Sequence, residues 1–293
     1  MPNVVTTSAN VIDPQVWADT VSPLLLGKSV MAGLSTQDDT LVGTPGSTVS
    51  FGTWVYSGDA RDAAEGVEIE ADGLSMTERH VSIKEIGKRL DLTDTATLIA
   101  LASPNSEAVS QSALAISRKI DTDLRVAAEL VTTGEFASSP LIFPTVAASL
   151  TYDAYVDASA LWGDEYDPAN VAALIVHSKQ YTQLRHDPDF ITVDKIGDRA
   201  SIITGQIGSL AGVAVIVSDR ATAIGTAGTA DAGHNALLIR RGALALRYKR
   251  RALVETDRNI AKRINTVVTT AHYAAHRADD RGVIVLGVLD AAV

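Results

Sequence analysis

The sequence predicts an α+β protein that combines a long projecting loop, one long helix and a compact α/β subdomain. A polar, acidic segment at Ser57–His80 is bounded by strand patterns on both sides. A helical period continues through Pro104–Leu130, and strands alternate with helices over about residues 150–235. A loop of this length has no core of its own, and such loops are usually functional or disordered. These features favour a subunit that reaches a neighbouring molecule over a self-contained catalyst.

The composition is that of a globular protein, with 46% hydrophobic and 20% charged residues among 293. The net charge of -10 argues against a protein whose main task is to neutralise duplex phosphates, because that task needs a basic face. The absence of cysteine excludes disulfides, thiolate catalysis and cysteine-ligated metal sites. No apolar run approaches the roughly 18 residues that span a bilayer. The first basic residue is Lys28, so we expect no signal peptide, no membrane partner, and a protein made and used, or assembled, in the cytoplasm.

Residues 1–41 are expected to form an N-terminal arm. Asp13 followed by Pro14 is typical of a helix start, and Val16 and Trp17 begin an apolar stripe. Pro23 then breaks or kinks this helix. Two arrangements stay open, namely a helix that packs on its own core and an arm that packs on another subunit.

Residues 42–92 are predicted to form an extended loop, as a β-hairpin, with its flanking strands. In Val49–Val55 apolar residues alternate with others, which is typical of a strand. The excursion Ser57–His80 carries seven acidic and two basic residues, a net charge of -5. A hairpin of this length would reach about 40 Å. The returning strand Val81–Leu92 changes the parity of its apolar positions, which predicts a bulge near Lys84–Glu85.

Residues 93–150 are predicted to be organised around one helix, Pro104–Leu130, which would span roughly 40 Å. Its apolar positions recur at helical spacing: Val109, Ala113, Ile116, Ile120, Leu124, Ala127 and Leu130. Asp121 and Asp123 point about 200° apart and cannot act as one carboxylate pair. We expect them to pair with Arg118, Lys119 and Arg125 on a solvated or inter-subunit face.

Residues 151–235 are predicted to form the α/β subdomain, and residues 236–293 a set of return strands. The expected elements of the subdomain are a helix at Tyr152–Trp162, a strand at Val171–Val176, a helix at Ser178–His186, a strand at Val213–Val217 and a surface loop at Ala221–His234. The expected return strands are Leu237–Arg240, Ala243–Val254, Asn265–Tyr273 and Gly282–Val288.

The return strands carry the basic residues that could receive the acidic loop. Between Ile239 and Arg263 lie nine Lys or Arg and two acids, a net charge of +7. The densest cluster is Arg247, Lys249, Arg250 and Arg251, on a strand expected to be half-exposed. Three uses stay open: a solvated face, contact with nucleic acid, and docking of a neighbour's loop. In the third case the partner residues are Glu65, Glu68, Glu70 and Asp72.

The sequence predicts no catalytic, cofactor or metal site. His272 and His276 have the spacing of a helical metal pair, but the β-branched residues before them favour a strand, on which they would lie about 13 Å apart. His177 follows a buried strand, a place where α/β enzymes put catalytic groups, but it also suits a helix start. Gly27-Lys28-Ser29 lacks the glycine that a phosphate-binding loop needs before it.

Several motifs and the order of the elements resemble those of one protein family. The motifs are Val49-x-Phe51-x-x-Trp54 before the acidic loop, Thr93-Asp94 before the long helix, Arg118-Lys119-Ile120-Asp121-x-Asp123-Leu124 within it, and Leu174–Tyr181 in the subdomain. With them, the chain resembles the major capsid protein of tailed bacteriophages, which has the Hong Kong-97-type coat fold. The resemblance implies an arm at 1–41, an extended loop at 42–92, a peripheral domain with a spine helix at 93–150, an axial domain at 151–235, and return strands of the peripheral domain at 236–293.

The resemblance implies a coat protein and not an enzyme. Such a protein assembles as hexamers and pentamers into an icosahedral head around double-stranded DNA and is part of the virion. Its partners would be its own copies, with separate scaffolding, portal and cement proteins, while DNA would be bound only weakly and without sequence preference. The extended loop contains no lysine, so cross-linking between lysine and asparagine is not expected there.

Two alternatives stay open. One is a homo-oligomeric α/β enzyme with His177 and Asp219 at a cleft. The other is a different phage structural protein, from the tail or the head-completion complex.

Overall fold

The computed structural model of the chain describes residues 30–55, 57–62, 68, 71–100, 103–133, 138–187, 209–226, 229 and 231–290. The expected helix start at Asp13 and the Gly27-Lys28-Ser29 segment lie outside these residues. So do Glu65 and Glu70 of the acidic loop.

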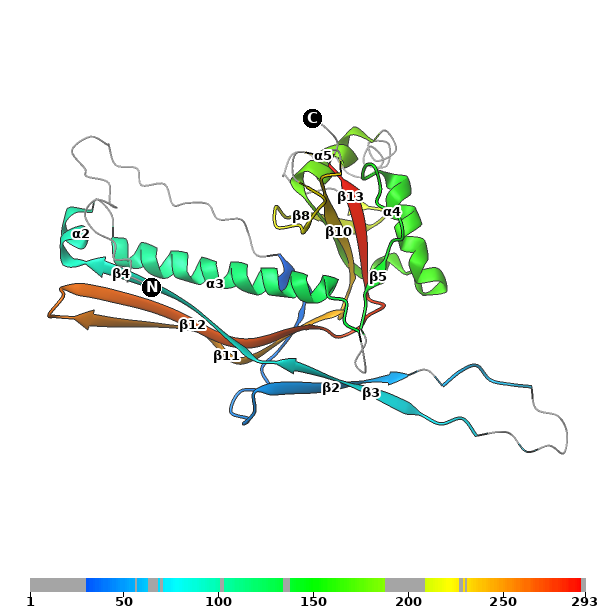
Figure 1. Cartoon of the computed structure of the whole chain (residues 1–293), viewed down its shortest axis with the longest axis horizontal. Coiled ribbons are helices and arrows are strands. Elements are labelled where there is room, and N and C mark those ends of the chain that lie inside the picture. The colour runs from blue at the N-terminus through cyan, green and yellow to red at the C-terminus, as the bar shows by residue number, and fades with distance from the viewer. Residues whose placement is uncertain are drawn as a thin grey trace.

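The described strands form three sheets, of four, seven and two strands. Figure 1 shows an elongated molecule in which the long helix α3 (Pro104–Glu129) lies along the four-stranded sheet. The seven-stranded sheet stands at one end of this helix, and the two-stranded hairpin projects beyond the body (Figure 1). The predicted α+β class is confirmed, while the boundaries of the arm, loop and domains stay predictions.

The hairpin consists of β2 (Thr48–Val55) and β3 (Ser75–Ser82), paired antiparallel with Val49 opposite Val81. The prediction of one returning strand over Val81–Leu92 is wrong. The chain leaves the hairpin at Ile83 and continues as β4 (Lys84–Thr93) in the four-stranded sheet. The change of parity therefore marks the passage between two sheets and not a bulge, because each sheet buries its own face.

The four-stranded sheet has the order β1-β11-β12-β4. β11 (Leu244–Asn259) and β12 (Ile264–Arg277) form a long antiparallel ribbon, whose register shifts after Tyr248 and again after Arg250. Such bulges bend a strand and increase its twist. β1 (Thr36–Asp38) runs parallel to β11 and pairs only with Ala245–Arg247, so the rest of that edge of β11 has no partner among the described strands.

Helix α3 confirms the predicted spine and follows two short helices, α1 (Met31–Leu34) and α2 (Asp94–Ile99). It buries residues four apart: Ala108, Ser112, Ile116, Ile120, Leu124 and Ala128. The expected burial of the face Val109, Ile116, Ile120 and Leu124 is confirmed for the last three, whereas Val109 is only half-buried. A step of four advances about 40° beyond a full turn, so the buried row winds around the helix, as suits a helix that crosses a twisted sheet.

The seven-stranded sheet contains both strands predicted for the α/β subdomain, and it also includes the expected return strands near Leu237–Arg240 and Gly282–Val288. Its order is β5 (Leu141–Ile142), β13 (Val283–Leu289), β10 (Gly233–Arg240), β6 (Val171–Val176), β8 (Val213–Val217) and β7 (Ser209–Leu210), and β9 (Ala223–Ile224) pairs with β10. β6, β8 and helix α5 (Ser178–His186) have the predicted bounds. Two expectations are corrected. Helix α4 (Tyr152–Ser159) continues as a 3₁₀ segment through Glu165, with another at Pro168–Asn170, and the expected loop before His234 contains β9 and the start of β10.

One buried cluster joins the spine helix to both larger sheets. Ile120 and Leu124 of α3 share it with Ile175 of β6, Leu246 of β11 and Tyr273 of β12. The helix thereby fixes one sheet relative to the other. No helix within the described residues has the length and apolarity needed to cross a membrane.

Candidate interaction surfaces

The hairpin has two unlike faces. Cross-strand pairing places Val49, Phe51 and Arg79 on the face that packs against the body, where Val49 is buried and the Phe51 ring lies 4.3 Å from that of His276. The opposite face carries Trp54, 65% exposed, directly across from Met76, 51% exposed. Apolar side chains exposed together in this way are typical of protein contact sites.

A network of charged groups holds the base of the hairpin. Both terminal nitrogens of Arg79 donate to the carboxylate of Asp280, which also accepts from Arg277 Nε and Ser138 Oγ, each at 2.8 Å. Arg277 in turn donates to the carbonyl groups of Ala128 and Leu130 at the end of α3. Burial alone would raise the pKa of Asp280, but these hydrogen bonds outweigh it and hold the pKa below its usual value.

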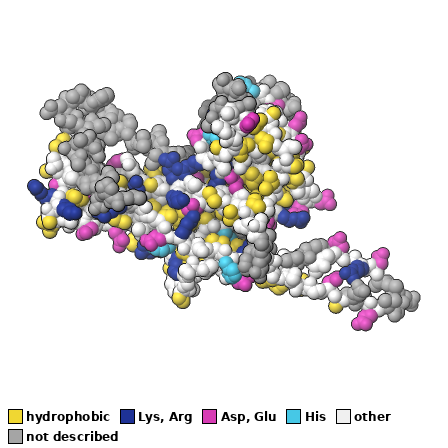
Figure 2. Space-filling view, viewed as in Figure 1, with side chains coloured by type: hydrophobic (Ala, Val, Ile, Leu, Met, Phe, Trp, Pro, Cys, Tyr) yellow, Lys and Arg dark blue, Asp and Glu magenta, His cyan; other side chains and the backbone are white. Residues whose placement is uncertain are grey.

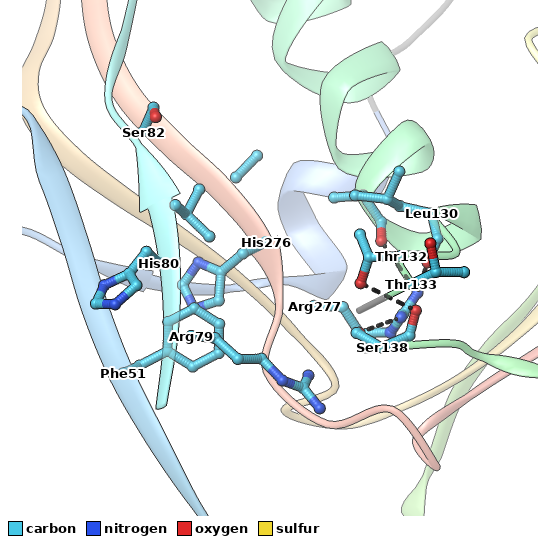
Figure 3. A pocket seen from close by; sticks show the side chains of 13 residues that line it. Phe51, Arg79, His80, Ser82, Leu130, Thr132, Thr133, Ser138, His276 and Arg277 are labelled. Carbon is cyan, nitrogen blue, oxygen red and sulfur yellow. Dashed lines mark hydrogen bonds between the residues drawn. The ribbon is translucent and has the colours of Figure 1, made fainter. Parts of the chain in front are cut away.

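A cavity of about 430 Å³ lies beside this network, between β3, β12 and the end of α3 (Figure 3). Phe51 and His276 lie on one side of it, and Leu130 and Thr132 on the other. Burial, and to a smaller extent the nearby charge of Arg247, lower the pKa of His276 to about 4. The neutral imidazole thus belongs to the apolar contact at the hairpin base. Sequence reasoning missed this site, whose local signal is the three-residue spacing of Arg277 and Asp280.

The acidic loop continues outward from the hairpin. Glu68 is exposed, and Asp72 lies 3.1 Å from Arg61 in an ion pair within the loop. In the space-filling view, acidic side chains mark the projecting end of the molecule (Figure 2). In Figure 1 the hairpin and the far end of the β11–β12 ribbon extend in opposite directions.

The basic cluster lies on β11 in the expected alternation. Leu244, Leu246 and Tyr248 are buried, whereas Arg250 and Arg251 are exposed and Arg247 and Lys249 are half-buried. Part of the cluster already has partners in its own chain. Arg251 forms an ion pair with Asp39 at 2.7 Å, Lys249 Nζ donates to the Gly46 carbonyl, and Arg250 donates to Thr270 Oγ1.

Asp121 and Asp123 are buried, so their expected place on a solvated or inter-subunit face is wrong. Asp121 accepts hydrogen bonds from the backbone N–H groups of Val30, Met31 and Ala32, the orphan donors at the start of α1. Asp123 forms the expected pair with Lys119 and a second pair with Lys84. Arg125 forms its ion pair with Glu129.

The candidate catalytic histidine has a structural role. His177 is the N-cap of α5, and its Nδ1 accepts from the Lys179 N–H in a capping box that Gln180 completes. Asp219 is exposed near it. His272 and His276 lie on a strand, as expected, and His272 faces Glu85 at 3.5 Å.

His177, His234 and Asp290 bring ligand-type atoms within 4.8 Å of one another. The two imidazole rings are stacked, however, with centroids 3.8 Å apart and planes 3° from parallel. The lone pairs of ring nitrogens lie in the ring planes, so those of two parallel rings cannot converge on one ion. This arrangement is a stacked pair and not a coordination site.

No family model matches the chain. The major capsid protein of Staphylococcus phage phiMR11 is 29% identical over 289 residues, which cover 96% of this chain and 94% of that protein. A solved structure from Mycobacterium phage Che8 aligns with a TM-score of 0.68 at 19% identity, over 94% of this chain and 97% of its own. The capsid asymmetric unit of cyanophage Pam1 aligns over all of both chains with a TM-score of 0.68 at 14% identity. The chain therefore has the Hong Kong-97-type coat fold and is similar along almost its whole length to tailed-bacteriophage major capsid proteins, which confirms the resemblance noted in its sequence.

Proposed function

We propose that this chain is the coat protein of a tailed-phage head, which assembles with its own copies, as hexamers and pentamers, into an icosahedral shell around double-stranded DNA. The observation that carries the proposal is the projecting hairpin, whose outer face exposes Trp54 and Met76. An isolated protein gains nothing from such a face, whereas a subunit can bury it against the next copy.

The role is structural and not enzymatic. His177, the strongest catalytic candidate in the sequence, caps a helix and stacks on a second histidine. The protein becomes part of the virion after assembly in the host cytoplasm. Scaffolding, portal and cement proteins are its further partners, and packaged DNA is bound only weakly, in keeping with a net charge of -10.

The acidic loop docks on the basic strand of a neighbouring copy. On the loop side the contact involves Glu65, Glu68, Glu70 and Asp72, and on the strand side Arg247, Lys249, Arg250 and Arg251. The opposite directions of hairpin and ribbon favour a contact between copies, because head-to-tail contacts that close build rings and shells. One exposed ion pair contributes only about 0–1 kcal/mol. The charges therefore determine partner choice and register more than affinity.

The first experiment tests the function itself. The purified full chain is examined by analytical sedimentation and negative-stain microscopy, alone and with a crowding agent. Shells, hexamers or pentamers support the proposal. A defined dimer or tetramer would favour the enzyme alternative, and rings or tubes would favour a tail or head-completion protein.

The second experiment tests the docking contact. Changing Glu65, Glu68 and Glu70 to Lys is expected to lower the assembled fraction while circular dichroism shows an unchanged fold. Adding Arg247→Glu and Arg250→Glu to this variant is expected to restore part of the assembled fraction. Arg251 is kept, because its pair with Asp39 stabilises its own subunit. Normal assembly of the triple Lys variant would refute this contact but would not contradict the proposed coat function.

A further inference from the structure

Four elements of the axial subdomain meet at the stacked pair of His177 and His234. His177 begins α5, His234 lies in β10, Asp290 follows β13, and Asp219 follows β8. His234 Nδ1 lies 2.9 Å from Asp290 Oδ1, and Lys179 Nζ lies 2.9 Å from the other oxygen of that carboxylate. Both ends of the stack are therefore held by polar contacts.

A fully protonated His177 ring is incompatible with the helix cap. His177 Nδ1 accepts the Lys179 N–H at 3.3 Å, so that nitrogen must be unprotonated for the cap to exist. His234 Nδ1 lies 2.9 Å from Asp290 Oδ1. A proton on both rings would place two cations 3.8 Å apart and remove the acceptor that caps α5. It would also place a positive charge at a helix N-terminus, where the dipole disfavours it.

A buried amide makes the two histidines respond together. Gln180 is fully buried, and its Oε1 accepts from the His177 N–H at 3.0 Å while its Nε2 donates to the His234 carbonyl at 2.6 Å. The start of α5 and the start of β10 are thus joined through one side chain. Separation of the rings would disturb the capping box, and the capping box includes Gln180.

We propose that the stacked His177–His234 pair is an acid-sensitive lock, which holds the start of α5 on the seven-stranded sheet while His177 is neutral and releases it when His177 takes up a proton. Some of the groups that face His177 lower its pKa, and others raise it. Burial lowers its pKa most, followed by the charge on His234, and Lys179 adds to this, whereas Asp219 and Asp290 raise it. The net effect is a pKa below the ordinary value of 6.5.

The direction of the pH effect follows from this depressed pKa. The folded protein binds the proton of His177 less readily than the unfolded chain does, so the stabilising contribution is complete above pH 6.5 and is lost as the pH falls through the folded-state pKa. Acidification below pH 6.5 should therefore loosen α5 before the sheets separate.

The test measures hydrogen-exchange protection factors of α5 in the full chain between pH 7.5 and 5. We expect protection to fall by up to about tenfold for each pH unit between 6.5 and the lower folded-state pKa of His177, and to level off below that pKa, since one proton controls the opening. In His177→Asn the fall should vanish, because asparagine caps a helix well and does not titrate. His186→Asn is the matched control, because His186 is exposed in the last turn of the same helix and should leave the fall unchanged.

A second readout does not depend on the stability of any variant. Histidine Cε1 proton shifts in the unmodified protein should give His177 a pKa below 6.5. The proposal is overturned if His177 titrates at or above pH 6.5, or if His177→Asn loses α5 protection with acid as the unmodified chain does.

Discussion

Asp280 joins three parts of the molecule at one carboxylate. It binds Arg79 of the hairpin, Ser138 and Arg277, and Arg277 binds the end of the spine helix. The hairpin also contacts the body through the Phe51 ring, which lies against His276. The Asp280 carboxylate is therefore one of the links that position the hairpin on the body.

Asp280→Asn should loosen the hairpin while the body stays folded. An amide cannot serve two guanidinium groups as a carboxylate does, and Arg79 would lose its partner. About four-fifths of each side chain in the Arg79–Asp280 pair is shielded from solvent, so we expect the substitution to lower the free energy of unfolding by about 2–3 kcal/mol. Limited proteolysis should cut β3 faster, with the exposed Asp279→Asn as the control. Equal cutting of both variants would show that the network does not position the hairpin.

His276 should make the protein sensitive to acid. Its pKa is lowered to about 4, so its stabilising contribution is complete above pH 6.5 and lost as the pH falls towards 4. This lowering of the His276 pKa corresponds to about 3 kcal/mol in the free energy of unfolding. His276→Gln should reduce the dependence of the free energy of unfolding on pH between 6.5 and 4, measured by urea titration, whereas His186→Gln should not. An undiminished slope in His276→Gln would show that His276 does not cause this dependence.

At this scale the sequence predicts little, because the partners of a polar residue lie far along the chain. Asp121 binds backbone groups some ninety positions away, and Arg79 reaches Asp280 over 201. Local pattern shows neither contact. The expected Lys119–Asp123 pair is confirmed because its residues are four apart on one helix, where periodicity alone brings them together.

Among the elements, the spine helix gives the sharpest prediction. Ile120 is 6% exposed in the cluster between two sheets, whereas Val126 of the same helix is 55% exposed. Ile120→Asp would bury an unpaired charge and should cost more than about 4 kcal/mol. We expect insoluble protein from Ile120→Asp and soluble, folded protein from Val126→Asp. Soluble Ile120→Asp with an unchanged melting temperature would contradict the burial of this face.

The bounds of an element could be predicted where an apolar run or a helix cap in the sequence coincides with the ends of the element. β6 and β8 are continuous apolar runs, and α5 begins at a polar cap, so their bounds follow from the sequence. The end of β3 at Ser82 could not be predicted, because β3 and β4 form one extended stretch whose halves belong to different sheets. Pairing partners decide that boundary, and they lie at the other end of the chain.

At the scale of the whole molecule, the hairpin should meet the β11 ribbon of another copy. Leu253 is 42% exposed beside Arg250 and Arg251, so an apolar and a basic surface adjoin there, as an apolar and an acidic one do on the hairpin. The chain contains no cysteine, so introduced pairs react cleanly. Trp54→Cys combined with Leu253→Cys should give a ladder of cross-linked species with a short bismaleimide, since head-to-tail contacts extend beyond a dimer.

The control pairs Trp54→Cys with Leu98→Cys, a side chain of α2 that is 85% exposed and lies away from the basic cluster. Denaturing electrophoresis should show monomer for this pair. A ladder from both pairs, or from neither, would contradict the assigned contact.

The edge of β11 that no described strand covers has a consequence for the subunit before it is incorporated. Beyond Arg247 this edge offers, within the described part of the chain, a row of backbone donors and acceptors, the template on which β-rich chains stack into fibrils. Free subunits at high concentration in a cell face that risk. The two register shifts of the strand and the adjoining arginines oppose it, because a bent, charged edge cannot add identical strands in register. We therefore expect the irregularities of β11 to disfavour amyloid among unassembled chains.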